Sequence, residues 1–234
     1  MKVPRNFSVF VQYIIDEWIP PRIRDSRLFM YLPMRFVLRD TAKTFMGFKE
    51  FIFNATDEEF SELYNETAHV QELQGETDLN EACTQEILKN ITGRTVLEVG
   101  CGRGYLANKV SKKFKITACD IVIPSAVKSK YPKIKFIEGN IQSLPFKDDS
   151  FDTVVTTHTL EHVQDLPGAL LELRRIAKKE LIIVVPRQRP YKYTFSLHTQ
   201  FFPYKWSLEN AFSTRDRKYS IKKLGDWYYH EELS

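Results

Sequence analysis

The feature that most constrains the fold of this 234-residue chain is a glycine-rich run that directly follows a short apolar segment. Residues 95–99 (TVLEV) are β-branched or apolar apart from Glu98, and this composition predicts a short buried strand. The glycines after it have no Cβ atom, so they tolerate positive φ and let a ligand lie against the main chain. Residues 105–114 then predict a helix. A strand, a glycine turn and a helix in this order predict the first crossover of a nucleotide-binding α/β sheet.

The spacing of the glycines and the acid before them indicate which ligand the turn accepts. A dinucleotide fingerprint has the spacing G-x-G-x-x-G, whereas here the third glycine comes one residue early and Tyr105 follows it. Glu98 stands at the end of the predicted strand, where a carboxylate repels a pyrophosphate and suits a cation. The run resembles motif I (E/D-x-G-x-G-x-G) of the class I S-adenosylmethionine-dependent methyltransferases, whose cofactor carries a sulfonium and an α-ammonium group. The resemblance implies that the following residues contact the cofactor: Glu98, Gly100, Cys101, Gly102 and Gly104.

The chain after the glycine turn continues this resemblance in order. Residues 115–120 (KITACD) predict a second strand that ends in an acid. This is the expected position of an acid that accepts hydrogen bonds from both ribose hydroxyls. Residues 134–139 predict a third strand. The segment 140–146 (NIQSLPF) is similar to the family's G-D-A-x-x-L-P-F segment, which borders the adenine, with an asparagine in place of the aspartate. Its amide oxygen can still accept from the adenine amino group. The resemblance thus extends the cofactor-binding set to Asp120, Ile121, Asn140, Ile141 and Thr157.

Two further strands complete the predicted core. Residues 151–157 (FDTVVTT) predict the fourth strand and residues 181–186 (LIIVVP) the fifth, with a helix at about 166–178 between them. The segment 158–163 (HTLEHV) resembles the L-E-H-[VI] signature of the type 11 subgroup. There we expect Glu161 and His162 mainly to orient the loop, and a catalytic part for His162 is a hypothesis.

The resemblance implies an α/β fold class, with a Rossmann-like methyltransferase sheet that is mostly parallel, helices on both of its faces and an N-terminal α-helical extension. We expect residues 1–90 to form a helical cap or lid region and residues 91–234 to form the S-adenosylmethionine-binding methyltransferase domain. Only about 48 residues follow the fifth strand, so the terminal hairpin must be compact, at 219–224 with 227–230. In the extension, Thr56 and Glu59 predict a capping box.

Composition and charge favour a cytoplasmic enzyme without a metal. The chain has no run of about eighteen apolar residues and no signal-peptide pattern. Its three cysteines lack metal-ligand spacing, which fits reduced thiols. Residues 54–86 carry ten acidic and no basic side chains, which argues against a broad nucleic-acid-binding surface despite the net charge of +4. The oligomeric state is not predicted.

Residues 18–49 interleave aromatic, Leu and Met side chains with seven Arg or Lys and only two acids. This mixture fits an interfacial helix in peripheral contact with an anionic membrane. It also fits a lid whose arginines hold a substrate phosphate, or a helical layer whose arginines extend from a packed face. The stretch loosely resembles the N-terminal parts of small methyltransferases found with bacterial surface-polysaccharide enzymes.

The chain after the fifth strand is the second place where substrate groups are expected, because ligands of an open α/β sheet bind at the carboxyl ends of its strands. Its cations can hold a phosphate or carboxylate, and its tyrosines can line the site of an amine. A solvated basic loop is an equally good reading. The segment 198–203 (HTQFFP) is similar to H-x-x-F-F-P segments of the same sugar-linked methyltransferases. The candidate substrate-binding residues are Arg187, Arg189, Tyr191, Lys192 and Tyr193.

The resemblance predicts methyl transfer to a small-molecule acceptor, because the positive sulfur of the cofactor already activates the methyl group. A hydroxyl acceptor benefits from a general base, and His158, at the end of the fourth strand, and His198 are the hypotheses for that base. The leading acceptor is a sugar hydroxyl of a surface-glycan precursor. The alternatives are N-methylation of a phospho-base such as phosphoethanolamine, and a non-catalytic cofactor-binding subunit of a glycan enzyme.

Overall fold

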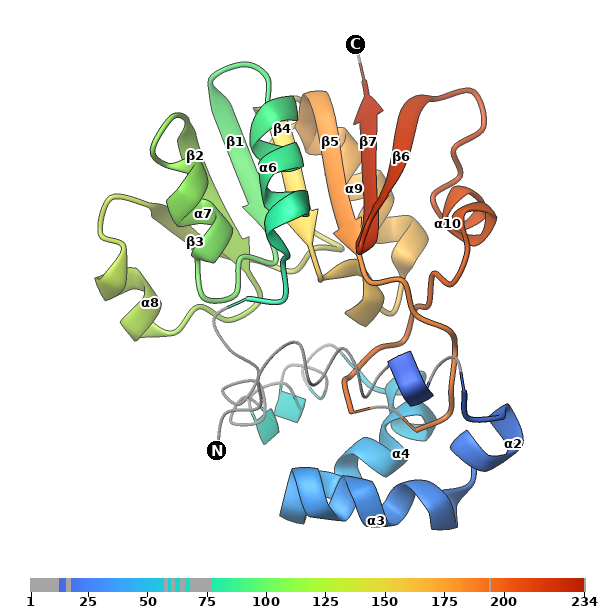
Figure 1. Cartoon of the computed structure of the whole chain (residues 1–234). Helices are drawn as coiled ribbons and strands as arrows, with labels where there is room; N and C mark the ends of the chain where they lie inside the picture. Colours follow the sequence, from blue (N-terminus) through green and yellow to red (C-terminus); the bar gives the residue numbers. More distant parts are fainter. Residues whose placement is uncertain are drawn as a thin grey trace. The chain divides into compact units, whose positions relative to one another are not determined.

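The structure is a computed structural model. It describes residues 13–15, 18–56, 59, 62–63, 66–67, 77–193 and 195–233. The chain divides into two compact units (Figure 1). The helical unit comprises Met1–Gly75 with Gln188–Phe201, and the sheet unit comprises Glu76–Arg187 with Phe202–Ser234.

The sheet unit is built on one seven-stranded sheet with the order β3-β2-β1-β4-β5-β7-β6. The strands are β1 (Thr95–Val99), β2 (Lys115–Asp120), β3 (Lys135–Glu138), β4 (Phe151–Thr157), β5 (Ala177–Val185), β6 (Lys218–Leu224) and β7 (Asp226–Glu232). Strands β1 to β5 pair in parallel, and β7 is antiparallel to both β5 and β6. The predicted Rossmann-like, mostly parallel sheet is therefore confirmed.

Local sequence placed most of these strands accurately. The ranges of β1, β2 and β4 agree with the predictions to the residue. Strand β5 begins four residues before the predicted start, because Ala177 and Glu180 already pair with β4 and Glu180 also pairs with β7. It ends before Pro186, which has no N–H to donate to a ladder.

Helices cover both faces of the sheet (Figure 1). The helical segments of this unit are α6 (Glu81–Asn90), α7 (Tyr105–Val110), α8 (Ser125–Lys130), the 3-10 turn η3 (Leu160–His162), α9 (Leu166–Ile176) and α10 (Lys205–Ala211). Apolar side chains of α6 and α7 belong to one core cluster, and those of α9 and α10 to another. The Asn80 side chain caps α6 by accepting from the Cys83 amide at 2.8 Å. Helix α7 is shorter than predicted, since Ser111 turns back to donate its hydroxyl to the Asn108 carbonyl.

The helical unit has its own core. Its helical segments are α2 (Pro21–Arg24), α3 (Arg27–Leu38), the 3-10 turn η1 (Arg39–Thr41) and α4 (Ala42–Ile52). Apolar side chains of α3 and α4 pack with Tyr193 and Leu197 from the segment 188–201. The predicted capping box is confirmed, because the Thr56 amide donates to Glu59 Oε2 at 2.8 Å and the Glu59 amide to Thr56 Oγ1 at 3.2 Å.

The two compact units differ from the expected division at residue 90. Helix α6 groups with the sheet, because Cys83 and Ile87 are buried in a sheet cluster. The segment 188–201 groups with the helices, because its side chains enter their core. Among the described residues, no helix is long and apolar enough to cross a membrane.

Candidate functional site

The glycine turn after β1 is built around one close approach and one open side. Gly100 has φ of 76°, and a Cβ added there would lie 1.9 Å from Thr159 Oγ1, so no other residue fits. Its amide and that of Cys101 both donate to the Cys119 carbonyl, at 2.8 and 3.0 Å. A Cβ on Gly102 would meet no described atom within 4 Å. The turn is therefore anchored at its first glycine and open at its second.

Glu98 is a buried carboxylate next to this turn. Glu98 is 2% exposed, and its Oε2 has no hydrogen-bond partner among the described residues. Burial and the nearby Asp120 raise the pKa of the Glu98 carboxyl well above its usual range. An unsatisfied buried carboxylate oxygen is costly, and a bound cation or N–H donor would relieve that cost. The chemistry of Glu98 thus fits a positively charged ligand group.

Asp120 connects β2 to the glycine turn. Its Oδ2 accepts from the Gly102 amide at 2.7 Å and its Oδ1 from the Ile121 amide at 2.8 Å. Burial raises the pKa of this carboxyl, while the backbone donors counteract the rise. A carboxylate has about four lone-pair sites and three backbone donors act on this one, so it can still accept from a ribose hydroxyl.

The remaining predicted cofactor residues follow β3 and β4. Asn140 Oδ1 accepts from the Gln142 amide at 3.0 Å, and Asn140 forms a β-bridge with Ser143. Ile141 is buried in the core cluster under α9. The Thr157 carbonyl accepts from the Thr159 hydroxyl at 3.1 Å. Parallel pairing places the carboxyl ends of β1 to β4 at one edge of the sheet, so the structure brings the predicted cofactor set together.

The two cysteines of this edge are neutral thiols. Burial raises the pKa of the Cys119 thiol to about 12 and that of Cys101 still further. Such thiols are poor nucleophiles at neutral pH, so neither cysteine is a candidate nucleophile.

His158 directly follows β4 and lies between two carboxylates. Its Nδ1 is 3.4 Å from Glu161 Oε1, and its Nε2 is 3.5 Å from Asp226 Oδ2. Burial lowers the His158 pKa, but the nearby carboxylates of Asp226 and Glu161 outweigh burial and raise it to about 10. An imidazole that is already protonated at neutral pH cannot accept a proton. This environment therefore opposes the hypothesis that His158 is a general base.

Two partners of this network carry no sequence signal for their role. Asp226 begins β7, and its Oδ2 also accepts from Asn80 Nδ2 at 2.9 Å. Neither residue stands in a motif that predicts this contact. The two are 146 residues apart, so only the folded chain shows that they meet.

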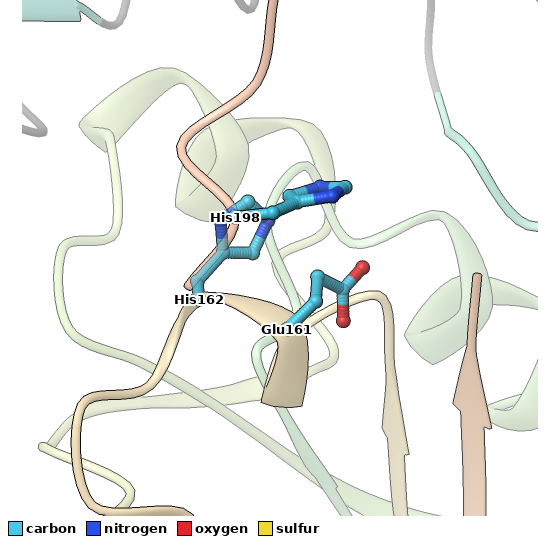
Figure 2. A group of neighbouring side chains, drawn as sticks. All are labelled: Glu161, His162 and His198. Atoms are coloured by element: carbon cyan, nitrogen blue, oxygen red, sulfur yellow. The ribbon is translucent and has the colours of Figure 1, made fainter. Parts of the chain in front are cut away.

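Glu161 and His162 are consecutive residues of η3, and Figure 2 shows their side chains leaving that turn. The Glu161 side chain is buried and faces His158. The charge of His162 lowers the pKa of Asp120. Both residues thus act on neighbouring groups of the sheet edge, in keeping with an orienting role.

The candidate substrate residues after β5 divide between the two units. Arg187 belongs to the sheet unit. The helical unit contains the other four, which are Arg189, Tyr191, Lys192 and Tyr193. There the two tyrosines are buried, and the Tyr191 hydroxyl accepts from Gln188 Nε2 at 2.5 Å. The Lys192 amide donates to Asp25 Oδ1 at 2.7 Å. Packing within the helical unit therefore already uses much of this set.

His198 also belongs to the segment 188–201 (Figure 2). Its Nδ1 is 2.6 Å from Gln188 Oε1. Because an amide oxygen only accepts, this contact keeps the proton on Nδ1 and places the basicity of the ring at Nε2. The hypothesis that His198 is a base therefore concerns Nε2.

Comparisons with known proteins find methyltransferases among the proteins that resemble this chain. The family model described as "Methyltransferase domain" matches residues 97–185. A probable S-adenosylmethionine-dependent methyltransferase of Mycobacterium tuberculosis is 30% identical over 135 residues, which are 56% of this chain and 46% of that protein. A 2-phytyl-1,4-naphtoquinone methyltransferase of Nostoc sp. is 28% identical over 123 residues, 47% of this chain and 54% of that one. The chain thus spans about half the length of these relatives.

A solved structure shows the same fold. It is the 1,6-didemethyltoxoflavin-N1-methyltransferase of Burkholderia thailandensis, with S-adenosylhomocysteine bound, and it aligns at a TM-score of 0.55 and 17% identity. The alignment covers 75% of this chain and 85% of that one. The fold is therefore that of a class I methyltransferase structure, and residues 97–185 are similar to methyltransferase domains. Within that class, the cofactor that fits the residues at the sheet edge is S-adenosylmethionine.

Proposed function

We propose that this protein is an S-adenosylmethionine-dependent methyltransferase that acts on a small polar acceptor. The observation that carries the proposal is the buried, partly unsatisfied Glu98 carboxylate beside the open glycine turn. A pyrophosphate would be repelled there, whereas a cofactor with an ammonium and a sulfonium group is attracted.

The residues of the sheet edge have distinct parts in this proposal. The Gly102 main chain can approach the cofactor because no Cβ intervenes, and Asp120 can accept from the ribose hydroxyls. Asn140 can accept from the adenine amino group. The bound cofactor supplies an activated methyl group, and the protein aligns an acceptor with it, which can lower the barrier by roughly 7–11 kcal/mol.

The acceptor that we propose first is a sugar hydroxyl of a surface-glycan precursor. The loose likeness of the segments 18–49 and 198–203 to sugar-linked methyltransferases supports it. A hydroxyl acceptor benefits from a base worth about 10²–10⁴-fold, and His198, with its basicity at Nε2, is the candidate.

One observation favours a second acceptor, the amine of a phospho-base such as phosphoethanolamine. His158, the histidine at the end of β4, is kept protonated by Glu161 and Asp226. An amine that arrives unprotonated needs no strong base, so the state of His158 does not hinder its methylation.

Cofactor binding is tested first, by calorimetry of the full chain with S-adenosylmethionine and S-adenosylhomocysteine. Asp120→Ala should weaken binding at least tenfold, because the carboxylate holds both the turn and the ribose. Asp148→Ala is the matched control, since its side chain is 74% exposed. Binding of a nicotinamide or flavin nucleotide in place of S-adenosylmethionine would contradict the proposal.

Turnover is tested with methyl-labelled cofactor and two acceptor panels, nucleotide-linked sugars and phospho-amines. Product from the sugars that falls with His198→Gln supports the first acceptor. Product that disappears when the amine is acetylated supports the second. Cofactor binding without transfer or hydrolysis would identify a non-catalytic binding subunit.

A further inference from the structure

Helix α3 in the helical unit is apolar on two opposite sides. One side is buried in the core through Met30 and Met34. The other side presents Leu28, Leu32 and Phe36, which are 82%, 70% and 87% exposed. Residues four apart lie above one another on a helix, so these three form one continuous stripe, which we call the α3 ridge.

Exposed apolar side chains gather around this ridge. Among the described residues, twelve of the sixteen exposed large hydrophobic side chains lie in the helical unit, and four lie in the sheet unit. Those that neighbour the ridge in sequence are Ile23, Phe29, Tyr31 and Val37. Such a concentration exceeds the scattered apolar residues of an ordinary surface and marks an interaction site.

The charges next to the ridge are almost all positive. Helix α3 contains no acidic residue, and Arg27, Arg35 and Arg39 lie along it or at its end. Asp40 opposes them, 3.5 Å from the Arg35 guanidinium, but its side chain is almost fully exposed. A partner for this surface must therefore combine an apolar interior with negative charge at its edge.

A pocket beside α3 has the same chemistry. Its volume is about 190 Å³. Arg27 and Tyr31 of α3 line it together with Lys43 of α4, and Glu50 is its acidic member. The Glu50 carboxylate is countered by Lys192, whose Nζ is 3.5 Å away. Two cations and a tyrosine hydroxyl next to an apolar ridge suit a lipid phosphate whose chains lie along that ridge.

We propose that the α3 ridge lies in the interface of an anionic lipid membrane, with Leu28, Leu32 and Phe36 among the acyl chains and the flanking arginines at the phosphates. Charge decides for a membrane over a second copy of the chain, because two basic ridges facing each other would repel. The inference does not depend on the proposed methyl transfer.

Vesicle flotation of the full chain tests it. One set of vesicles is pure phosphatidylcholine, and the other contains about 30% phosphatidylglycerol. The chain should float with the anionic vesicles, remain unbound with the neutral ones, and be released by high salt.

Two variants separate the apolar and ionic contributions. Partitioning of the ridge variant L28S/L32S/F36S into anionic vesicles should be about tenfold weaker than that of the wild type. The charge variant R27Q/R35Q/K43Q should lose about fivefold for each charge removed. The matched control L171S/W206S removes side chains that are 65% and 66% exposed in the sheet unit, and it should float like the wild type.

Three results would overturn the proposal. The first is wild-type chain that ignores anionic vesicles. The second is a ridge variant that floats as the wild type does. The third is a wild-type dimer in sedimentation that the ridge variant dissociates, without vesicle binding. Circular dichroism confirms folding, and if the triple variant fails to fold, the single variant F36S is tested in the same way.

Discussion

The two units handle polar and apolar side chains in opposite ways. The sheet unit buries charges in pairs, as with Glu231, whose Oε2 lies 2.9 Å from the Arg174 guanidinium, and with His158 between Glu161 and Asp226. The helical unit instead exposes apolar residues along α3 while Met30 and Met34 fill its core. Contacts within the protein thus specify the sheet unit, whereas the exposed apolar side of α3 fits the membrane contact proposed above.

The largest effect is expected from the buried Glu231 in β7. Its carboxylate accepts from Arg174 and from the Tyr229 hydroxyl, so Glu231→Gln leaves the Arg174 charge uncompensated. The free energy of unfolding should fall by about 3–5 kcal/mol in urea denaturation. The neighbouring exposed pair is the control, and Glu232→Gln should cost less than about 1 kcal/mol. Equal effects at both positions would contradict the distinction between buried and exposed charges.

Two glycines of the turn should respond differently. Gly100→Ala places a Cβ against Thr159 at a positive φ and should destabilise the fold by about 3 kcal/mol. Gly102→Ala fills open space and should cost about 1 kcal/mol of stability but at least tenfold in affinity for S-adenosylmethionine. Thermal melting and calorimetry measure the two quantities. A Gly102→Ala protein with unchanged cofactor affinity would show that the open side does not receive the cofactor.

The His158 network should stabilise the sheet unit at low rather than high pH. Its folded-state pKa of about 10 lies above the ordinary value of 6.5. The stabilisation is therefore complete below pH 6.5 and is lost as the pH rises to about 10. The difference in unfolding free energy between the wild type and His158→Gln should be about 2 kcal/mol at pH 6 and shrink toward pH 10. A difference that does not change with pH would indicate a neutral His158.

Lys49 in the helical unit should show the opposite pH dependence with a smaller amplitude. Its ammonium lies 4.3 Å from the Phe201 ring centroid, and burial lowers its pKa from 10.5 to about 8. The folded state binds the proton less tightly than the unfolded state, so stability rises between pH 8 and 10.5. In thermal melting, the free energy of unfolding of the wild type should rise by about 1 kcal/mol relative to that of Lys49→Met in that range. Lys43 is exposed in α4, so Lys43→Met serves as the control.

The local sequence was sufficient to predict those features of the sheet unit that depend on contacts between neighbours along the chain. Strands β1, β2 and β4 follow from apolar runs bounded by glycine or charged residues, and the glycine spacing indicates the turn and its cationic ligand. The caps of α6 and α9 also act within three residues of their helices, through Asn80 and Asp165. Short-range geometry depends only on neighbours along the chain, so a single sequence contains it.

Which distant residues meet, and which apolar side of α3 faces outward, depends on the folded chain. Asn80, His158 and Asp226 come together from three separated segments, and their electrostatic environment, rather than residue type, protonates the imidazole. Helix α3 carries apolar residues on both sides, so its sequence pattern could not tell the packed side with Met34 from the exposed ridge with Phe36. The physical reason is the same in both cases, because burial and pairing are properties of the surroundings that a side chain acquires when the chain folds.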